Sequence, residues 1–290
     1  MKWFDYAAPD SLAEAVQLLS THSGAMPFAG GTDLLVQLRS GGRETGLVID
    51  VKRISELNEL SCHRTGGLKL GAAVPCCRVY ENAAVRKAYP ALAEVASLIG
   101  GVQIQSRASI GGNLCNATPS ADSVPVLIVL QAECRIAGPA GAREIDVEDF
   151  CTGPGRNVLQ PGELLVSLQL PPPQPHSGAH YLRFTPRNEM DIAVAGAAAA
   201  VVIEKGAFRW ARIALAAVAP TPLLVREAGE WLVGKPVNAE SIHAAAEIAR
   251  DAAKPITDMR GTAEFRRHLC GVLTRRALEA AVQRARKGRA

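Results

Sequence analysis

Hydrophobic positions recur with two different periods along the chain, and each period predicts one type of element. In residues 12–19 the apolar side chains share one face of a helix, with Asp10 or Ser11 as its cap and Glu14 completing a capping box. Short apolar runs at 26–29 and 46–51 predict strands, and 34–40 predicts a short helix or turn. The first 55 residues are therefore expected to alternate helix and strand.

The middle of the chain continues this alternation. Residues 80–99 predict a helix that Pro90 splits in two, and the apolar run 123–132 predicts a buried helix. Strands are predicted at four places, with a loop over 152–162 before the last: 68–75, 133–138, 143–150 and 163–171.

The clearest boundary is the proline-rich stretch 171–179, which favours an extended connector. Beyond it, residues 183–206 and 210–224 predict strands. Helices are predicted at 222–233, 239–253 and 262–287, where the chain becomes rich in Ala and Arg.

Composition is that of a globular protein, with 48% hydrophobic and 21% charged residues among 290. The net charge of +4 is small, and much of the excess lies in the final helical stretch, where basic residues alternate with Ala, Leu and Val. Aromatic residues make up only 4%, so a solvated helix face is favoured over a nucleic-acid contact.

The seven cysteines have no regular spacing and form no Cys-x-x-Cys, which indicates reduced thiols in a cytoplasmic protein rather than disulfides or an iron–sulfur or zinc site. His176 and His180 are four apart but follow a run of prolines, so a helical metal pair is not expected. The first 15 residues lack a secretory pattern, and the apolar run 193–203 is too short to span a membrane as a helix.

Two glycine pairs stand out in the amino-terminal half, AGGTDL at 29–34 and SIGGNL at 109–114. Glycine lacks a Cβ, so its N–H groups can approach an anion closely, and two such loops could neutralise a diphosphate without Lys or Arg. Asp33 is expected to accept backbone N–H bonds that hold the first turn. Valine at Gly111 or Gly112 is expected to abolish ligand binding while the fold survives.

Each pair alone is more often a plain turn than a ligand site. The polar, small-residue stretch 114–122 after the second pair favours the ligand. Gly-x-Gly-x-x-Gly, Walker A, His-Glu-x-x-His and Gly-x-Ser-x-Gly motifs are all missing, which argues against a conventional NAD enzyme, ATPase, zinc protease or esterase.

Four segments carry a resemblance: 29–35, 109–122, 162–171 and 183–196. Their order and spacing resemble the FAD-binding medium subunit of molybdenum hydroxylases, the carbon monoxide dehydrogenase and xanthine dehydrogenase type. The resemblance covers essentially the whole chain. It implies an α+β fold with a vanillyl-alcohol-oxidase-type FAD-binding domain of two α+β subdomains, 1–55 and 56–172. A carboxy-terminal domain with a small antiparallel sheet and helices, 173–290, would follow.

The resemblance also implies roles for individual residues. The first diphosphate loop would comprise Pro27, Phe28, Ala29, Gly30, Gly31, Thr32, Asp33 and Leu34, and the second Ser109, Ile110, Gly111, Gly112 and Asn113. Asp122 would accept bonds from sugar hydroxyls, and Ile99 would contact the cofactor. Leu164 and Leu165 would pack on adenine or ribose, although from the sequence alone they are equally strand core. Arg183 falls where many relatives have Lys, which leaves its cofactor contact open, and Asp191 would lie near the flavin.

The function implied is that of an electron-transfer subunit, because no catalytic acid, base or nucleophile is evident and FAD would supply the redox chemistry. The expected partners are a large molybdenum-cofactor subunit and a small [2Fe–2S] subunit in an (αβγ)2 heterohexamer, with no nucleic acid and no metal on this chain. Two alternatives stay open: a stand-alone FAD oxidase, in which Cys115 could attach the flavin, and an assembly subunit without FAD.

Overall fold

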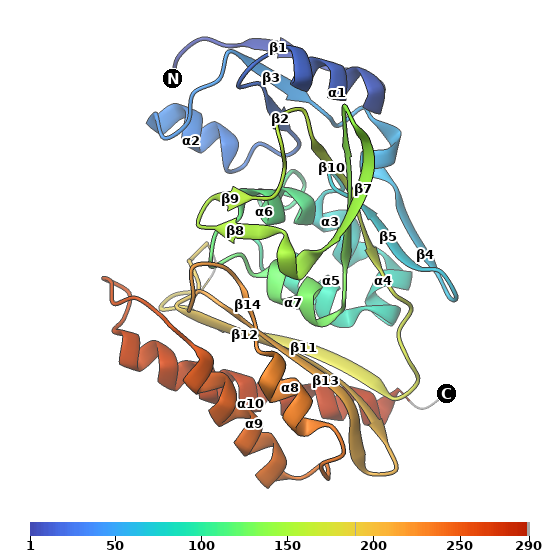
Figure 1. Ribbon diagram of the computed structural model, residues 1–290, viewed down its shortest axis with the longest axis vertical. Coiled ribbons are helices and arrows are strands. Elements are labelled where there is room, and N and C mark those ends of the chain that lie inside the picture. Colours follow the sequence, from blue (N-terminus) through green and yellow to red (C-terminus); the bar gives the residue numbers. More distant parts are fainter. Residues whose placement is uncertain (189, 289–290) are drawn as a thin grey trace.

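Three sheets of three or more strands follow one another along the long axis of the molecule in the computed structural model (Figure 1). The structure describes residues 1–188 and 190–288. Glu189 of the quoted 183–196 motif and Arg289 of the basic stretch lie outside the described residues. Over the described part of the chain, no helix has the length and apolar character needed to cross a membrane.

The first sheet is parallel, in the order β1–β3–β2, and belongs to the amino-terminal unit. Its elements are β1 (Asp5–Ala7), α1 (Leu12–Thr21), β2 (Met26–Phe28), α2 (Leu34–Ser40) and β3 (Leu47–Asp50). Ser11 caps α1 by accepting the N–H of Glu14 at 3.2 Å, as the sequence predicts.

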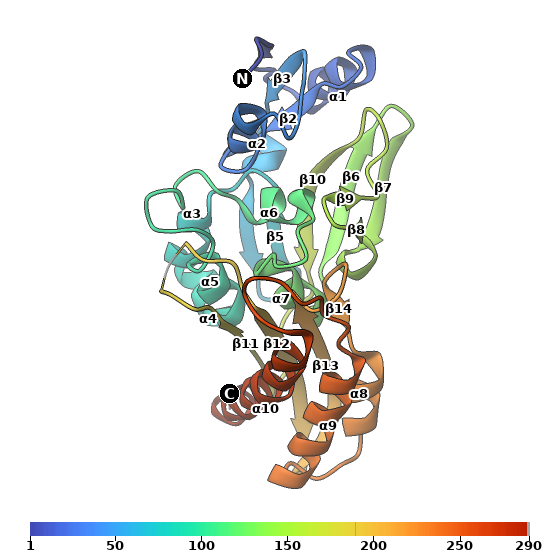
Figure 2. The same cartoon turned by 90° about the vertical axis from the view of Figure 1, so that its left-hand side faces the viewer.

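The second sheet has five antiparallel strands in the order β4–β5–β10–β6–β7. Its strands and 3₁₀ turns are η1 (Ser55–Asn58), β4 (Leu60–His63), β5 (Gly67–Gly71), β6 (Glu133–Gly138), β7 (Gly141–Asp146), η2 (Val147–Asp149) and β10 (Leu164–Leu170), with the hairpin β8 (Cys151–Gly153) and β9 (Arg156–Asn157) beside it. The helices are α3 (Cys76–Glu81), α4 (Ala83–Ala88), α5 (Pro90–Ala96), α6 (Ile110–Asn116) and α7 (Ser123–Val129). Helices α3, α4 and α5 gather on one side of the molecule (Figure 2).

Two sequence predictions for this region need correction. Residues 109–113 form the first turn of α6, with Ser109 as its cap, and not a loop. The predicted loop 152–162 contains the β8–β9 hairpin, and the strand predicted at 143–150 ends at Asp146, where the chain turns into η2. Pro90 begins α5 as its first helical residue, so the predicted break is confirmed, and Asn82 makes a second break by capping α4.

The third sheet is antiparallel, in the order β11–β12–β13–β14. Its elements are β11 (Ser177–Phe184), β12 (Ala195–Glu204), β13 (Ala207–Ala216), β14 (Leu223–Leu224), α8 (Arg226–Leu232), α9 (Ala239–Ala252) and α10 (Ala263–Lys287). The predicted helices 239–253 and 262–287 are confirmed within one residue at each end. The sheet lies between α7 and the helices α8–α10 (Figure 1).

The alanine run of β12 explains how helices can pack on both faces of the third sheet. Ala197 and Ala199 belong to the core that α8–α10 cover, whereas Ala198 and Ala200 belong to the core shared with α7. Successive strand residues point to opposite faces, so small side chains at every position let helices approach both faces.

The basic residues of α10 are only partly solvated, which corrects the expectation of a solvated face. Arg275 and Arg276 are exposed. Arg266 is 4% exposed and donates to the Val194 and Ala217 carbonyls and to the Asp258 carboxylate. Arg284 reaches across to Glu94 of the middle region.

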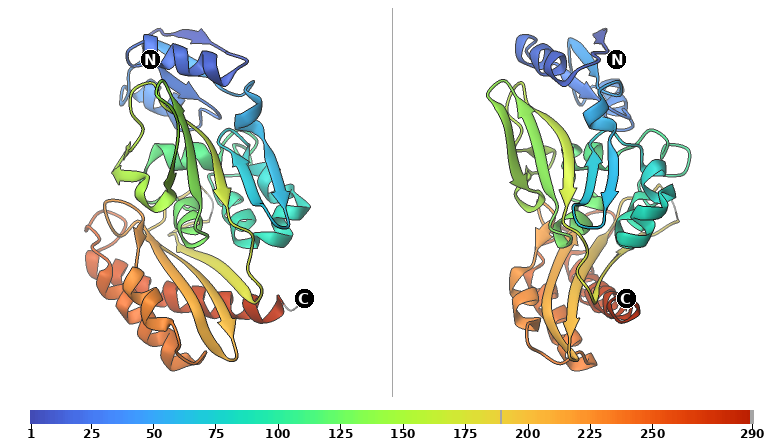
Figure 3. Two further views of the ribbon diagram at one scale, coloured as in Figure 1. Left: turned by 45° about the vertical axis from the view of Figure 1, so that its right-hand side comes forward. Right: turned by 90° about the vertical axis from the view of Figure 1, so that its right-hand side faces the viewer.

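Strand β10 joins the cores of the first two sheets. Leu164 and Val166 pack in the same hydrophobic cluster as α1 and β3, whereas Leu165 and Leu168 pack with the helices of the middle region. The three sheets viewed from the side show the same succession (Figure 3). The division of the chain into domains at residues 55 and 172 stays a prediction.

Glu148 connects the second and third sheets by ion pairs with Arg212 and Arg226. Its side chain is 11% exposed. Burial acts to raise its pKa, but the hydrogen bonds and charges of the two arginines outweigh burial and lower the pKa below its ordinary value.

Replacing Glu148 by Gln is expected to lower the free energy of unfolding at neutral pH by about 1–3 kcal/mol, because Arg212 loses its anionic partner in a half-buried place. A lowered pKa stabilises the fold above the unfolded-state pKa of about 4.3, and that contribution is lost as the pH falls through the folded-state pKa. The difference between wild type and variant in urea unfolding should therefore shrink in acid. Glu204→Gln, which removes an exposed pair with Arg209, is the matched control and should change little. An equal loss in both variants would contradict this role.

Candidate functional site

The two glycine segments meet in space. A Cβ added to Gly30 would lie 2.0 Å from the carbonyl oxygen of Arg107, which precedes Ser109 by two residues. The first segment thus rests directly on the chain that leads into the second, and only glycine allows that approach.

The side chains of Phe28 and Lys52 pack against the first segment. Gly31 has a left-handed φ of +72°, and a Cβ there would lie 2.1 Å from the Phe28 ring. The Lys52 ammonium lies 4.3 Å from the centre of the same ring and donates to the Ala29 carbonyl at 3.2 Å. These contacts fix the conformation of the turn.

The second segment is the start of α6. The Ser109 hydroxyl accepts the N–H of Gly112 at 3.0 Å, which keeps the hydroxyl hydrogen for another acceptor. Ser123 donates to the Asn113 side-chain oxygen at 2.6 Å and so orients the amide. Both polar groups predicted from the sequence are therefore held in place before any ligand binds.

The two glycines of α6 differ, which corrects the expectation that either can be replaced without harm to the fold. A Cβ at Gly111 would lie 2.5 Å from the Ala72 carbonyl oxygen, a backbone atom. A Cβ at Gly112 would meet only the Ser109 hydroxyl, at 3.0 Å. Gly111 is required by packing, and Gly112 leaves the cleft open for a ligand.

A cleft of about 1100 Å³, open solvent included, lies over both segments. Of the sequence-predicted residues it is lined by Pro27, Phe28, Ala29, Gly30, Gly31, Thr32, Asp33, Leu34, Ile99, Ser109, Gly111, Gly112, Asn113, Leu164 and Leu165. Leu164 and Leu165 are buried strand residues that also border the cleft.

The cleft is also lined by Gln37, Arg43 and Asn157, which the sequence analysis missed, and by Cys115 and Asn116 of the polar stretch 114–122. Gln37 donates to the Asn116 side chain at 2.9 Å and so joins α2 to α6. Asn157 donates to the Cys115 carbonyl at 2.8 Å. The run of small polar residues after Gly112 was the available signal for Cys115 and Asn116, whereas nothing local marks the others.

Asp33 does not accept the backbone N–H bonds that the sequence analysis predicts for it in the described residues. Within residues 1–188 and 190–288 its carboxylate accepts no backbone N–H bond, and α2 begins without a side-chain cap. The side chain reaches water in the open cleft, yet desolvation by the surrounding protein raises its pKa.

Four predicted residues lie off the cleft wall: Ile110, Asp122, Arg183 and Asp191. Ile110 is 1% exposed and packs in the core. Asp191 accepts the N–H groups of Arg187 and Ile192 and so shapes the turn after β11. Their roles toward a cofactor stay predictions.

Asp122 and Arg183 form an ion pair between the middle region and the third sheet. Tyr181 donates to the other carboxylate oxygen at 2.6 Å. Burial raises the pKa of Asp122, and the Arg183 charge together with the Tyr181 hydroxyl acts against that rise. Ser123, the residue after Asp122, donates to Asn113 of the cleft wall. The ion pair of Asp122 with Arg183 is therefore connected to the cleft through Ser123.

The residues of the cleft suit a dinucleotide with a diphosphate bridge. Glycines without a Cβ line the cleft beside the hydroxyl donors Thr32 and Ser109, and such a lining lets an anion approach the backbone closely. Ile99, Leu159, Leu164 and Leu165 supply apolar walls. Few polar groups among apolar walls are the usual composition of a cofactor site.

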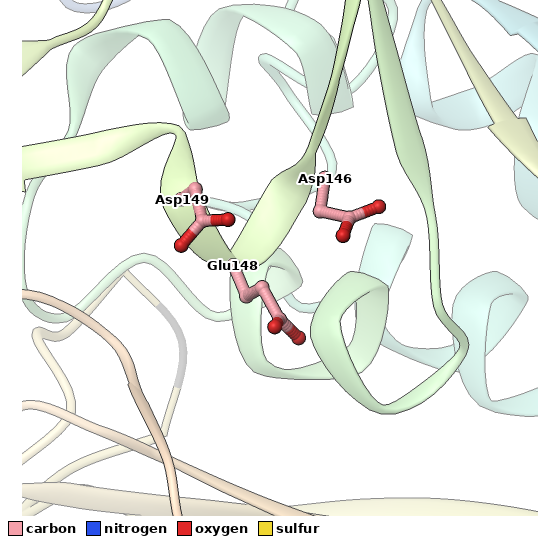
Figure 4. A group of neighbouring side chains, drawn as sticks. All are labelled: Asp146, Glu148 and Asp149. Carbon is pink, nitrogen blue, oxygen red and sulfur yellow. The ribbon is translucent and has the colours of Figure 1, made fainter.

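One group of carboxylates in the described residues has the spacing of metal ligands, at Asp146, Glu148 and Asp149 (Figure 4). Glu148 uses both of its oxygens on Arg212 and Arg226. The group is better explained as the anionic side of the contact between the second and third sheets.

Comparisons with known proteins agree with this site. Residues 2–173 match the family of the FAD binding domain in molybdopterin dehydrogenase, and residues 180–281 match the CO dehydrogenase flavoprotein C-terminal domain. The chain is 33% identical to the xanthine dehydrogenase FAD-binding subunit of Escherichia coli O157:H7, covering 97% of this chain and 98% of that protein. It is 32% identical to the carbon monoxide dehydrogenase medium chain of Afipia carboxidovorans, covering 98% of each.

Solved structures give the same result. A carbon monoxide dehydrogenase chain from Hydrogenophaga pseudoflava matches with a TM-score of 0.94 at 32% identity, covering 98% of both chains. A chain of quinoline 2-oxidoreductase from Pseudomonas putida matches with a TM-score of 0.91 at 32% identity, covering 98% of this chain and 99% of that one. The α+β fold expected from the sequence is thereby confirmed.

Proposed function

Because this chain belongs to the family of FAD-binding subunits of molybdenum hydroxylases, we propose that it transfers electrons from the [2Fe–2S] clusters of a small subunit, through FAD, to an external acceptor. The chain is thus one subunit of an oxidoreductase. Bound FAD supplies the redox chemistry, because it can take up electrons singly and give them up to oxygen, NAD or a quinone.

The observation that carries this proposal is the contact between the two glycine segments. Gly30 lies against Arg107, so the first segment, Gly30 to Thr32, and the second, Ser109 to Asn113, line one cleft. Thr32, Ser109 and Asn113 would hold the diphosphate, and Ile99, Leu164 and Leu165 would exclude water from the rings. Asp122, which pairs with Arg183 at the contact with the third sheet, would accept hydrogen bonds from the sugar hydroxyls, and Asp191 would lie near the flavin.

The proposed complex is an (αβγ)2 assembly with a large molybdenum-cofactor subunit, in the cytoplasm. Purification of the chain with its neighbours should give a complex with one extractable FAD for each copy of this chain, together with a large molybdenum-containing protein and a small iron–sulfur protein. A complex without flavin, or a flavin-containing chain that purifies alone with full oxidase activity, would contradict the proposal.

A stand-alone oxidase with covalent flavin is less well supported. Cys115 borders the cleft, but burial raises its pKa to about 12, so the thiol stays protonated and is a poor nucleophile. Acid denaturation should release the yellow colour from the polypeptide.

A further inference from the structure

Arg43 is the only cation that borders the cleft among the described residues. Two charged side chains line it, Asp33 and Arg43. Every other lining residue is neutral, including the glycines and the donors Thr32, Ser109 and Asn113. A diphosphate carries two negative charges, so its main electrostatic attraction in this cleft would come from Arg43.

The backbone brings Arg43 back over the cleft. Helix α2 ends at Ser40 and is capped by Gly41, which has a left-handed φ of +75°; the N–H of Arg43 then donates to the Gln37 carbonyl at 3.2 Å. Gln37 is itself tied to Asn116 of α6. Arg43 therefore belongs to a segment that is hydrogen-bonded to α2 and, through Gln37, to α6.

The guanidinium of Arg43 has no partner of its own. Within the described part of the chain it makes neither an ion pair nor a side-chain hydrogen bond, although it is half-buried. Nearby Lys2 and Glu44 pair with each other at 2.8 Å, and Lys52 is committed to Asp50 at 2.7 Å. A half-buried, unpaired Arg beside neutral donors is suited to an anionic ligand.

Arg43 lines the cleft and also borders a second hollow, whose lining includes Met1, Lys2 and Phe4 next to the amino terminus. Ile99 also lines the cleft, and the chain just beyond it, at Gly101, packs against Met190, which follows β11. The cleft thus runs from the amino-terminal unit toward the third sheet.

We propose that Arg43 binds the adenylate phosphate of FAD and supplies the ionic part of the cofactor's affinity. This inference rests on the proposed function, which directs the flavin ring toward the third sheet and therefore the adenosine toward Arg43. The planar guanidinium donates to phosphate oxygens through two N–H groups, while the glycine segments bind the bridge from below.

The test measures FAD binding to the full chain freed of flavin, by the quenching of flavin fluorescence at low and high salt. Arg43→Gln should weaken FAD binding about tenfold or more at low salt and should remove most of its salt dependence. Arg43→Lys keeps the positive charge but loses the planar pair of N–H donors. Its FAD affinity should lie between those of wild type and Arg43→Gln, and it should retain salt dependence. Arg39→Gln, an exposed arginine that borders the hollow but not the cleft, should bind FAD as wild type does.

Circular dichroism and urea midpoints establish that each variant is folded. If Arg43→Gln unfolds, Arg43→Lys decides the matter through its affinity and its salt dependence. Affinity and salt dependence of Arg43→Gln, or in its place of Arg43→Lys, equal to wild type would overturn the assignment of Arg43 while leaving the proposed function intact. Failure of the wild-type chain to bind FAD would instead overturn the proposed function.

Discussion

Gly112→Val should yield a folded protein that has lost its FAD. The valine side chain would stand in the cleft where the diphosphate has to approach the backbone, and only the Ser109 hydroxyl lies near its Cβ, at 3.0 Å. The helix loses little, because valine and glycine are both moderate or poor helix formers, so unfolding free energy should change by no more than about 1 kcal/mol. Flavin absorbance per chain and urea unfolding measure the two effects separately.

Gly111→Val is the paired variant with the opposite outcome. Its Cβ would be forced onto the Ala72 backbone, and we expect a destabilisation of about 3 kcal/mol or more from overpacking. Gly46→Val controls for glycine replacement as such, because no atom lies within 4 Å of a Cβ there and Gly46 is outside the cleft. Full flavin content in folded Gly112→Val would show that the diphosphate does not lie over this turn.

Arg183→Leu should be strongly destabilising, by about 3–5 kcal/mol at neutral pH, because it leaves Asp122 buried without a cation. The pKa of Asp122 would then rise further above the unfolded-state value of about 3.9. An acid whose folded-state pKa is raised destabilises the fold above the unfolded-state pKa, so the loss should disappear as the pH is lowered into that range.

The double variant Asp122→Asn with Arg183→Leu separates charge from shape. Without the buried carboxylate it should be more stable than Arg183→Leu alone, and urea unfolding at several pH values gives the coupling between the two positions. Single and double variants of equal stability and equal pH dependence would refute the ion-pair account. Flavin content of the double variant at a pH where it is folded reports separately on any cofactor role of these two residues.

The fold was largely predictable wherever one local signal decided it. Ser11 caps α1, Pro90 begins α5, and the long amphipathic helix α10 follows its periodicity. The turn 109–113 was not, because two glycines oppose helix formation locally by about 1 kcal/mol each, and the Ser109 cap together with the contact of Gly111 with Ala72 decides otherwise.

The site was predictable at the glycine segments and hidden elsewhere. Double glycines with hydroxyl and amide neighbours predict anion binding from the sequence alone. Arg43 enters the cleft only through the path of the chain after α2, and no local pattern distinguishes it from Arg39. The buried pair of Asp122 with Arg183 joins positions 61 residues apart, which a single sequence does not connect.

Strand β10 has a consequence for synthesis on the ribosome. Leu164 and Val166 complete the core beneath α1 and β3, so the amino-terminal unit emerges about a hundred residues before it can close. Until β10 leaves the exit tunnel, the nascent chain exposes apolar surface, and the core beneath the glycine segments is incomplete. Cofactor loading is therefore expected late in translation or after it, and a nascent chain stalled before residue 164 should be a chaperone client that takes up no flavin.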